Sequence, residues 1–493
     1  MMGYGIDFGT TNSVAAFSDG KTGKTLALTD KSSNLPHPSV VWYRPNVVEV
    51  GRNAKYQIRE YSEVAGNAFV TSVKRKLGHD HSYDILGEPK TAWEVAADIF
   101  GHLQSHANQE YKHQIENAVV TVPVYYDGRA RRELRRAANK AGIEIQTFIH
   151  EPFAAVVGYC LGSGRDITQF EGKNILVFDW GGGTLDITIC RVSNNRIYEL
   201  ATAGLNEIAG DFFDGRIEDY ARNKFVDQSG FRDDILVLRP GTPKRLTFEC
   251  ERAKISLSST VQERIQVARF FRRNDVEYDL DVSLGRVEFE ALIAADMEAA
   301  VRQVHRALGQ AALSPREVSL ALLIGGSSRI PLLQQHMFEL FGPRTVNVTN
   351  ADTIIAEGAA QISRHGWLPY LARPIQVRLA DESLYTVFEL GRVLKSEACR
   401  KDATFYCTDN RDGEARLVLA ETLRPGDSTS LTVKEILSVL VDAKLPKPYQ
   451  HERVYAVFEV DEDLIMHVSS WSATQEHVSK CEIHDLCYGL RLE

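Results

Sequence analysis

The chain has 493 residues, of which 44% are hydrophobic and 25% charged, and its formal net charge is −9. This length predicts roughly two to four structural units, and the composition is typical of soluble globular proteins. The acidic balance argues against a nucleic-acid binder, and the sequence has no run of about 18 apolar residues that would predict a membrane span. No basic stretch with an apolar signal core precedes the first apolar strand. We therefore expect a cytoplasmic protein without nucleic-acid or membrane partners.

The seven cysteines are scattered along the chain and show no C-x-x-C spacing. This usage predicts reduced thiols and no disulfide framework. Cys481 and Cys487 lie close in sequence to His477 and His484, which raises the alternative of a bound metal. Their spacing matches no common zinc pattern, so we expect ordinary strand and loop residues there.

Strands alternate with helices up to about residue 368, which is the pattern of an α/β fold. The expected strands are 117–122, 143–149 and 320–324. The expected helices are 127–141, 151–161, 286–312 and 328–340.

A Gly-x-x-Pro stretch at 366–369 breaks this pattern. Short alternating segments follow and predict an antiparallel β domain. These segments are 375–379, 384–390, 404–408, 415–421, 453–460 and 464–470. One weak helix candidate at 433–440 interrupts them. We therefore divide the chain into a first unit at 1–368, a linker at 369–374 and a β domain at 375–493.

A strand–turn–strand motif occurs twice in the first unit, as GIDFGTTNSV at 5–14 and as VFDWGGGTLDI at 177–187. In each copy an apolar strand leads into an Asp, an aromatic residue and a glycine, then a turn with Thr and a second apolar strand. Such a repeat predicts two related lobes that face one cleft. Backbone N–H groups and hydroxyls in the turns suit phosphate oxygens, and the paired Asp7 and Asp179 suit a hydrated Mg²⁺. The repeat therefore predicts a nucleoside triphosphate between the lobes, whereas one copy alone would fit a plain hairpin equally well.

Two further sequence segments fit the same site. Glu151-Pro152 directly follows a strand, where a carboxylate is also explained as a cap that complements the helix dipole. The segment LIGGSSRIP at 323–331 is a strand–Gly-Gly–helix junction, which would place a phosphate or ribose over a helix N-terminus. A tight connection without a ligand is the alternative for this segment.

The two copies of the repeat, Glu151-Pro152 and segment 323–331 make four motifs. In this order they resemble the DnaK-type molecular chaperones, the seventy-kilodalton heat-shock family, over roughly residues 3–365. Further matching segments are VKRKLG at 73–78, VVTVPVYY at 119–126, CERAK at 250–254, NAD at 350–352 and GAA at 358–360. The resemblance implies an actin-like ATPase unit with two ribonuclease H-like halves. It also implies bound ATP or ADP with Mg²⁺ and an accompanying K⁺, and slow ATP hydrolysis.

The resemblance assigns a role to each site residue. Asp7, Glu151 and Asp179 would surround the hydration shell of Mg²⁺. Lys74 would contact the γ-phosphate and orient the attacking water, with help from Thr184 and Asp186. The implied phosphate contacts are Gly9, Thr10, Thr11, Asn12, Gly181, Gly182, Gly183 and Thr184. The implied ribose and adenine contacts are Glu251, Lys254, Ser258, Gly325, Gly326, Ser327, Arg329 and Asp352.

The sequence also departs from the family pattern. Ile255 stands where most members have a second arginine against the adenine, which removes a cation–π contribution. Segment 147–153 lacks the Arg, Asn and Thr that the family offers to J-domain partners, so we expect no generic J-domain co-chaperone. The short acidic-leucine linker is missing, and only the β half of a substrate-binding domain is recognisable, without the helical lid.

The predicted helix at 127–141 is rich in arginine. Arg131 occupies the position that the family uses for signalling between domains. We expect most of the other arginines of this helix to form a solvated face: Arg129, Arg132, Arg135 and Arg136.

We interpret the chain as a chaperone-like ATPase in which ATP hydrolysis changes the binding of a protein or peptide client by the β domain. A nucleotide-dependent switch for one dedicated partner is an alternative, favoured by the missing linker and J-domain residues. A small-molecule kinase on the same fold is a second alternative, but it needs a base and a substrate pocket that the sequence does not identify.

Overall fold

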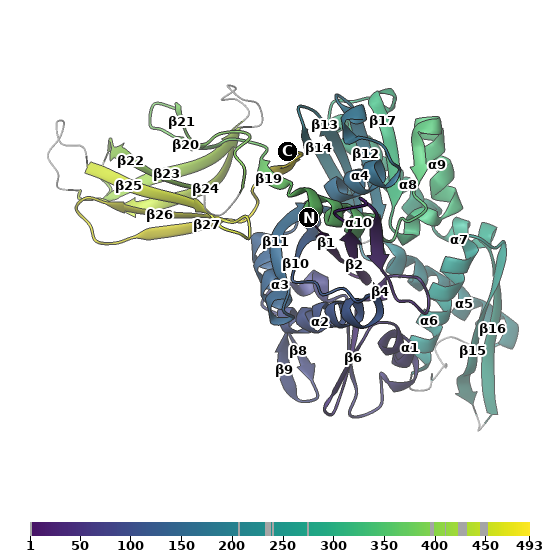
Figure 1. The fold of residues 1–493 in the computed structure, drawn as a ribbon. Helices are drawn as coiled ribbons and strands as arrows, with labels where there is room; N and C mark the ends of the chain where they lie inside the picture. The colour runs from purple at the N-terminus through teal and green to yellow at the C-terminus, as the bar shows by residue number, and fades with distance from the viewer. Residues whose placement is uncertain are drawn as a thin grey trace.

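The computed structural model describes residues 2–205, 208–231, 238, 241–273, 276–394, 399–409, 411–422, 431–443 and 452–493. In Figure 1 a large two-lobed α/β unit lies beside a smaller β domain, and the end of the chain returns to the large unit. The predicted α/β unit followed by an antiparallel β domain is therefore confirmed. Within these described ranges, no helix combines the length and the apolar character needed to cross a membrane.

The first lobe is built on a mixed sheet in the order β11-β10-β1-β2-β3, with β4 also paired to β2. A small sheet, β6-β5-β7, and the hairpin β8-β9 extend this lobe. Its strands are β1 (Gly3–Phe8), β2 (Asn12–Ser18), β3 (Thr25–Leu28), β4 (His37–Pro38), β5 (Val40–Arg44), β6 (Val47–Val50), β7 (Ala68–Thr71), β8 (Ser82–Ile85), β9 (Glu88–Thr91), β10 (Asn117–Val122) and β11 (Glu144–His150). Its helices are α1 (Arg52–Tyr61), η1 (Val73–Lys76), α2 (Ala92–Tyr111) and α3 (Gly128–Lys140).

Local sequence signals start the main helices of this lobe. Thr91 and Glu94 form a capping box at the start of α2, and Val95, Ile99 and Leu103 recur at helical spacing on its buried face. The Asp127 carboxylate accepts a hydrogen bond from a backbone N–H at the start of α3.

The second lobe is built on a seven-stranded sheet in the order β18-β17-β12-β13-β14-β28-β19, in which β19 (Leu368–Leu371) and β28 (Tyr488–Arg491) come from later in the chain. The strands from the first unit are β12 (Asn174–Trp180), β13 (Leu185–Val192), β14 (Arg196–Leu205), β17 (Val318–Ile324) and β18 (Thr345–Asn347), and a separate hairpin consists of β15 (Gln262–Arg273) and β16 (Val276–Gly285). The helices are η2 (Ile167–Phe170), α5 (Gly210–Ser229), α6 (Thr242–Leu257), α7 (Arg286–Leu292), α8 (Ala294–Gln310), η4 (Pro315–Glu317), η5 (Gly326–Arg329), α9 (Pro331–Phe341) and η6 (Gly342–Arg344).

The two lobes repeat one strand pattern, as the sequence repeat predicts. In the first lobe β1 pairs antiparallel with β2 and parallel with β10. In the second lobe β12 pairs antiparallel with β13 and parallel with β17. Asp7 and Asp179 therefore occupy matching positions near the ends of the first strands of the two halves.

Helices α4 (Glu151–Gly162) and α10 (Ile354–His365) cross between the two lobes. Their contact depends on glycine, because a Cβ at Gly358 would stand 1.8 Å from the carbonyl oxygen of Ala154. A Cβ at Gly5 of β1 would likewise stand 2.2 Å from the backbone nitrogen of Ala360. Two helices and a strand thus approach at backbone distance, which holds the two sheets around one cleft.

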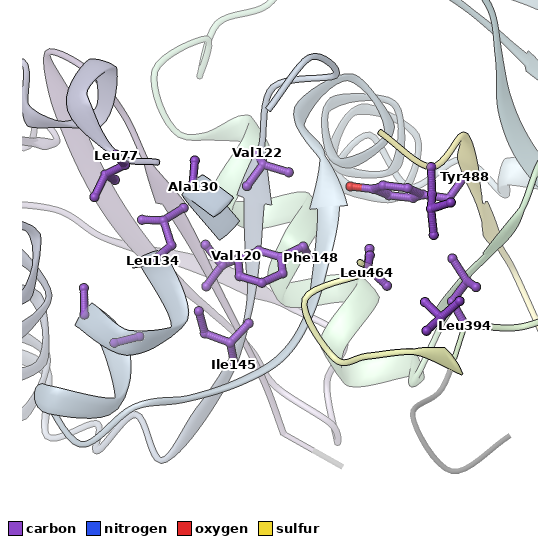
Figure 2. Packing of buried hydrophobic residues seen from close by; sticks show 14 of the residues in the cluster. Leu77, Val120, Val122, Ala130, Leu134, Ile145, Phe148, Leu394, Leu464 and Tyr488 are labelled. Atoms are coloured by element: carbon purple, nitrogen blue, oxygen red, sulfur yellow. The ribbon is translucent and has the colours of Figure 1, made fainter. Parts of the chain in front are cut away.

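The β domain contains two four-stranded sheets, β21-β20-β23-β24 and β22-β25-β26-β27. Their strands are β20 (Ile375–Arg378), β21 (Leu384–Phe388), β22 (Arg400–Cys407), β23 (Glu414–Thr422), β24 (Leu431–Leu440), β25 (Glu452–Val460), β26 (Met466–Ser472) and β27 (Ser479–Ile483). One apolar cluster joins this domain to the first lobe, and Figure 2 shows Phe148 of β11 in the same packed region as Leu464 and Leu394. The domain is thus packed directly on the first lobe.

Two predicted helices differ from the structure. The candidate at 433–440 is wrong, because this segment belongs to strand β24. Its Leu437 and Val439 are buried two residues apart, as in a strand, and β24 pairs with β23 along its length. The single helix predicted at 286–312 is divided at Ile293 into α7 and α8.

The predicted linker also has a different structure. Strand β19 (Leu368–Leu371) overlaps its first residues and pairs antiparallel with β28 (Tyr488–Arg491). Strand β28 in turn pairs antiparallel with β14 of the second lobe. The last strand of the segment assigned to the β domain therefore lies in a sheet of the first unit, and both ends of the β domain are tied to that sheet.

Candidate functional site

All predicted site residues line one cavity of about 1020 Å³ between the lobes. From the first lobe these are Asp7, Gly9, Thr10, Thr11, Asn12, Lys74 and Glu151. From the second lobe these are Asp179, Gly181, Gly182, Gly183, Thr184, Asp186, Glu251, Lys254, Ser258, Gly325, Gly326, Ser327, Arg329 and Asp352. Residues far apart in sequence are thus brought to one cleft.

The two repeated turns face each other across this cleft. A Cβ on Gly182 would stand 2.4 Å from Oγ1 of Thr11, and a Cβ on Gly183 would stand 3.1 Å from Cγ2 of Thr10. Larger residues would therefore fill the gap between the turns. Glycine leaves the backbone N–H groups accessible for close approach of an anion.

A buried lysine stands at the centre of the cavity among carboxylates. Lys74 Nζ donates a hydrogen bond to Oε1 of Glu151 over 2.7 Å, and both side chains are at least nine-tenths buried. The 3-10 helix η1 positions this lysine, and the preceding Ser72 adopts a left-handed conformation (φ 55°) that turns the chain into the cleft. Although burial acts to lower it, the carboxylates of Glu151 and Asp7 raise the pKa of Lys74 above its ordinary value.

The carboxylates around Lys74 repel one another. Burial and the Glu151 charge raise the pKa of Asp7 to about 7 and that of Asp186 to about 6. Burial and the same charge raise the pKa of Asp179 well above its ordinary value. One lysine cannot balance four carboxylates in a buried site. Among the described residues no three His, Cys, Asp or Glu side chains are grouped closely enough to hold a metal ion directly, so these carboxylates fit only a hard cation that keeps its water ligands.

The wall formed by α6 is held by ion pairs. Lys254 Nζ lies 2.8 Å from Oδ1 of Asp214 and donates to the carbonyl oxygen of Gly210. Glu251 accepts a hydrogen bond from Lys55 Nζ of the first lobe over 2.6 Å, which links the lobes. Ile255 is 62% exposed at this wall. This part of the cavity therefore offers an apolar surface beside charges that already have partners.

The opposite wall carries the Gly-Gly junction. Arg329 Nη2 donates to Oδ2 of Asp352 over 2.6 Å, and Ser327 Oγ donates to the carbonyl oxygen of Gly181 over 3.0 Å. Gly325 has a positive φ of 79°, and a Cβ there would stand 2.7 Å from Oδ1 of Asp179. The junction is thus packed against the second of the two repeated turns.

Sequence reasoning missed three residues of the site. Arg75 Nη2 donates to the carbonyl oxygen of Gly183 across the cleft over 2.6 Å. Tyr126 Oη donates to the backbone carbonyl of Lys74 over 3.2 Å, and Lys55 bridges the lobes. Arg75 and Tyr126 belong to motifs quoted for the resemblance, but nothing in the sequence separates them from their solvated neighbours.

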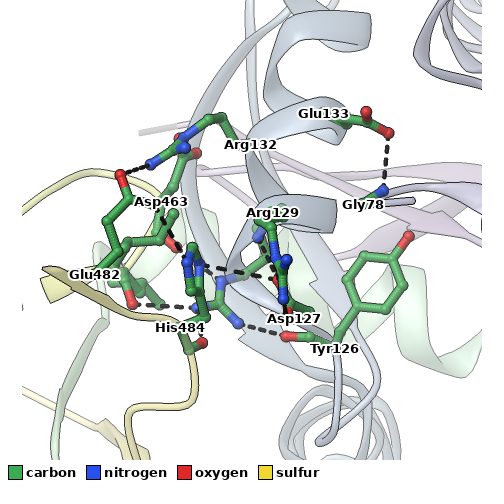
Figure 3. Close-up of polar contacts among 12 residues, drawn as sticks. Gly78, Tyr126, Asp127, Arg129, Arg132, Glu133, Asp463, Glu482 and His484 are labelled. Carbon is green, nitrogen blue, oxygen red and sulfur yellow. Dashed lines mark hydrogen bonds and ion pairs between the residues drawn. The ribbon is translucent and has the colours of Figure 1, made fainter. Parts of the chain in front are cut away.

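Helix α3 beside the cleft carries the contact with the β domain. Arg131 donates to the carbonyl oxygens of Asp463, Leu464 and His484. Figure 3 shows this contact, in which Arg132 reaches Glu482 and His484 lies near Asp127.

The expectation that most other arginines of this helix form a solvated face is wrong for Arg135. Its guanidinium is buried against Asp463, with Nε 2.6 Å from Oδ1. Arg132 pairs with Glu482, and Arg136 covers the ring of Trp93 at 3.8 Å. Arg129 is an exposed residue that pairs with Asp127 of its own helix cap. For Arg132, Arg135 and Arg136, contacts with segments distant in sequence therefore decide where the side chain lies.

Two lobes with one repeated strand pattern, facing glycine-rich turns and a lysine buried among carboxylates define a two-lobed, actin-like nucleotide-binding unit. A family model described as Hsp70 protein matches residues 3–90 and 82–364. This match extends over more than half of the chain, and the chain belongs to the Hsp70 family. Members of this family are ATPases with a nucleotide-dependent, chaperone-like role.

Proposed function

We propose that this protein binds ATP with Mg²⁺ in the interlobe cavity, hydrolyses it slowly, and thereby changes the binding of a protein or peptide client by the β domain at 375–493. The observation that carries the proposal is the buried pair of Lys74 and Glu151 between the two repeated turns. Phosphoryl transfer requires mainly positioning and neutralisation of charge, and a buried lysine beside N–H-rich turns supplies both.

Different residues of the cavity bind the phosphates and carry out hydrolysis. The turns at 9–12 and 181–184 hold the phosphates through backbone N–H groups and threonine hydroxyls. Lys74 neutralises charge on the transferring group, while Thr184 and Asp186 place the attacking water. The raised pKa of Asp186 brings this carboxylate closer to the range in which it can accept a proton from that water.

Asp7, Glu151 and Asp179 would hold Mg²⁺, mainly through its water ligands. Bound Mg²⁺ supplies neutralisation of the phosphate charges. The like charges of these buried carboxylates, which raise the pKa of Asp7 and Asp179 along with burial, support this assignment. The adenine base of ATP is held by the wall that contains Glu251, Lys254, Ser258 and Ile255. This wall faces the junction at 325–329.

A switch that serves one dedicated partner is the second candidate function. It is favoured by the contact between α3 and the β domain, where Arg135 and Asp463 form a buried ion pair. A domain held in this way is suited to a small change on nucleotide exchange. A panel of unfolded peptides, tested by fluorescence anisotropy with ATP and with ADP, separates the two, because a general chaperone binds many of them.

The hydrolysis itself is tested by release of phosphate from ATP with water as the acceptor. We expect slow release with Mg²⁺ and none with an excess of EDTA. Asp179→Asn should reduce release strongly, while Asp80→Asn, at an exposed position outside the cavity, should not. A protein that releases phosphate only when a small-molecule acceptor is added would instead be a kinase.

A further inference from the structure

We propose that Tyr488 of strand β28 is a positioning residue for Glu151, acting through His150, so that the strand that returns from the β domain sets the geometry of the ATP site. This inference rests on the proposed function, because it concerns regulation of the same cavity. It goes beyond the family match, which ends at residue 364, while β28 lies at 488–491.

The link from β28 to the ATP site begins at the contact between Tyr488 and His150. The two ring centroids lie 4.0 Å apart with an interplanar angle of 36°. His150 also meets the ring of Phe153, with the centroids 5.3 Å apart. Tyr488 and His150 are 1% and 4% exposed. The imidazole therefore contacts two aromatic rings in a closely packed region, where a displaced ring moves its neighbours.

The link continues from His150 to the catalytic centre. His150 ends strand β11, is the N-cap residue of α4, and directly precedes Glu151. The Glu151 carboxylate accepts the hydrogen bond from Lys74. Since one peptide bond links the two residues, a rotation of the His150 backbone moves the first residue of α4. The position of Glu151 opposite Lys74 then depends on the packing of His150.

Strand β28 itself is held by neighbouring strands on both sides. Leu490 pairs with Ile197 of β14 on one side and with Pro369 of β19 on the other. Gly489 allows this fit, since a Cβ there would stand 2.6 Å from the carbonyl oxygen of Ile197. Tyr488 belongs to the apolar cluster shared with the β domain, and Leu490 belongs to the cluster beneath α4. Because Tyr488 and Leu490 are two residues apart in a strand, both side chains lie on one face of β28, and Leu490 packs in the cluster that contains residues of α4.

The tyrosine hydroxyl has no role in this link. Oη of Tyr488 and Nδ1 of His150 have no hydrogen-bond partner within the described ranges of the chain. The proposed role therefore requires the aromatic ring alone. Figure 2 shows Tyr488 close to Leu464 of the β domain, so a displacement of that domain reaches the same ring.

The test compares three variants of the full chain. Tyr488→Leu keeps an apolar side chain but removes the ring, and Tyr488→Phe keeps the ring. The control is Tyr370→Leu, because Tyr370 of β19 is an equally buried tyrosine that pairs with Gly489 of β28. We expect Tyr488→Leu to lower kcat for ATP hydrolysis about tenfold with KM for ATP within a factor of about two, while the other two variants keep the kcat of the parent.

A second measurement needs no nucleotide and separates this inference from the proposed function. An amine-reactive acylating reagent is applied to the nucleotide-free proteins, and modification of Lys74 is measured by peptide mass spectrometry. We expect modification of Lys74 to be several-fold faster in Tyr488→Leu than in the parent, Tyr488→Phe or Tyr370→Leu. Equal rates in all four proteins would overturn the inference even if the parent hydrolyses ATP. Faster labelling in Tyr488→Leu alone would support it even if the parent does not.

Discussion

The guanidinium of Arg135 lies against the carboxylate of Asp463, with Nε 2.6 Å from Oδ1 and both side chains at least nine-tenths buried. This ion pair joins α3 of the first lobe to the turn between β25 and β26 of the β domain. Arg135 also donates to the carbonyl oxygens of Ile145 and Glu462, so its charge is surrounded by acceptors. The pair therefore fixes the position of the β domain relative to α3.

Removal of the carboxylate should weaken this docking. Asp463→Ala leaves a buried guanidinium with only carbonyl acceptors, and loss of one partner of a buried pair costs about 3 kcal/mol. We expect faster proteolysis between the α/β unit and the β domain and a lower free energy of unfolding in urea. Glu462→Ala is the matched control, because its carboxylate is exposed and 3.8 Å from Arg135. Equal effects of the two variants would show that the buried pair does not hold the domain.

Loss of the central lysine should abolish most of the catalysis. Lys74→Ala should lower kcat by about 10²-fold or more, because the positive charge acts mainly on the transferring group. Binding of ATP, measured by calorimetry, should change little. Lys76→Ala, at an exposed position of the same 3-10 helix, is the control and should keep the parent rate. Hydrolysis by Lys74→Ala at the parent rate would refute the assignment of Lys74.

The adenine wall should bind more tightly when an arginine is restored. Ile255→Arg should strengthen ATP binding by about 0.5–2 kcal/mol if the guanidinium stacks on the base. Val287→Arg adds the same charge at an exposed position that does not line the cavity, and should not have this effect. Unchanged affinity of Ile255→Arg in calorimetry would mean that another surface holds the adenine.

The buried His37 and the partly exposed His102 should make the protein sensitive to acid. His37 Nδ1 lies 3.0 Å from His102 Nε2, and burial together with the neighbouring histidines lowers the pKa of His37 to about 3 and that of His102 to about 4. The neighbouring His106 acts in the same direction and Asp30 in the opposite one. Their rings are therefore neutral in the folded protein at neutral pH.

The direction in which the free energy of unfolding changes with pH follows from the protons bound by the folded and the unfolded protein. Unfolded histidines take up protons near pH 6.5, whereas these folded ones do so only near pH 3–4, so the free energy of unfolding falls as pH drops below about 6.5. At pH 5 each of the two should contribute a loss of about 2 kcal/mol. Urea unfolding at pH 7.5 and pH 5 measures this. The double variant His37→Gln, His102→Gln should lose less than the parent, and His79→Gln, at an exposed position, should lose as much.

The crossing of α4 and α10 should not tolerate a side chain at Gly358. Gly358→Ala places a Cβ 1.8 Å from the Ala154 carbonyl oxygen, so the helices must separate, at a cost of about 3 kcal/mol. Gly162→Ala, at the end of α4, meets no heavy atom within 4 Å and should be neutral or slightly stabilising. Similar melting temperatures for the two variants would contradict the close crossing.

The predictable part of this protein consists of features with a local cause. The turns at 9–12 and 181–184 are recognisable because glycine and threonine between apolar strands have few other uses, and their repetition predicts two lobes. Continuous apolar runs predict β10 and β17, and alternating apolar residues predict β25, nearly to their ends. The family resemblance that these motifs carry supplied the other predicted site residues, such as Lys74, and all of the predicted residues line one cleft.

Other features depend on which segments meet in space. The apolar residues at 433–440 fit a helix or a strand, and pairing with β23 decides for the strand. Arg135 looks like its solvated neighbours until Asp463 packs against it, 328 residues along the chain. The sequence by itself thus determined the two repeated glycine-threonine turns and the α/β unit, because short-range sterics and hydrogen bonding specify them. Only the tertiary structure decided that β28 leaves the β domain, pairs with β14 and places Tyr488 on His150, because strand pairing between distant segments depends on what the rest of the fold leaves open.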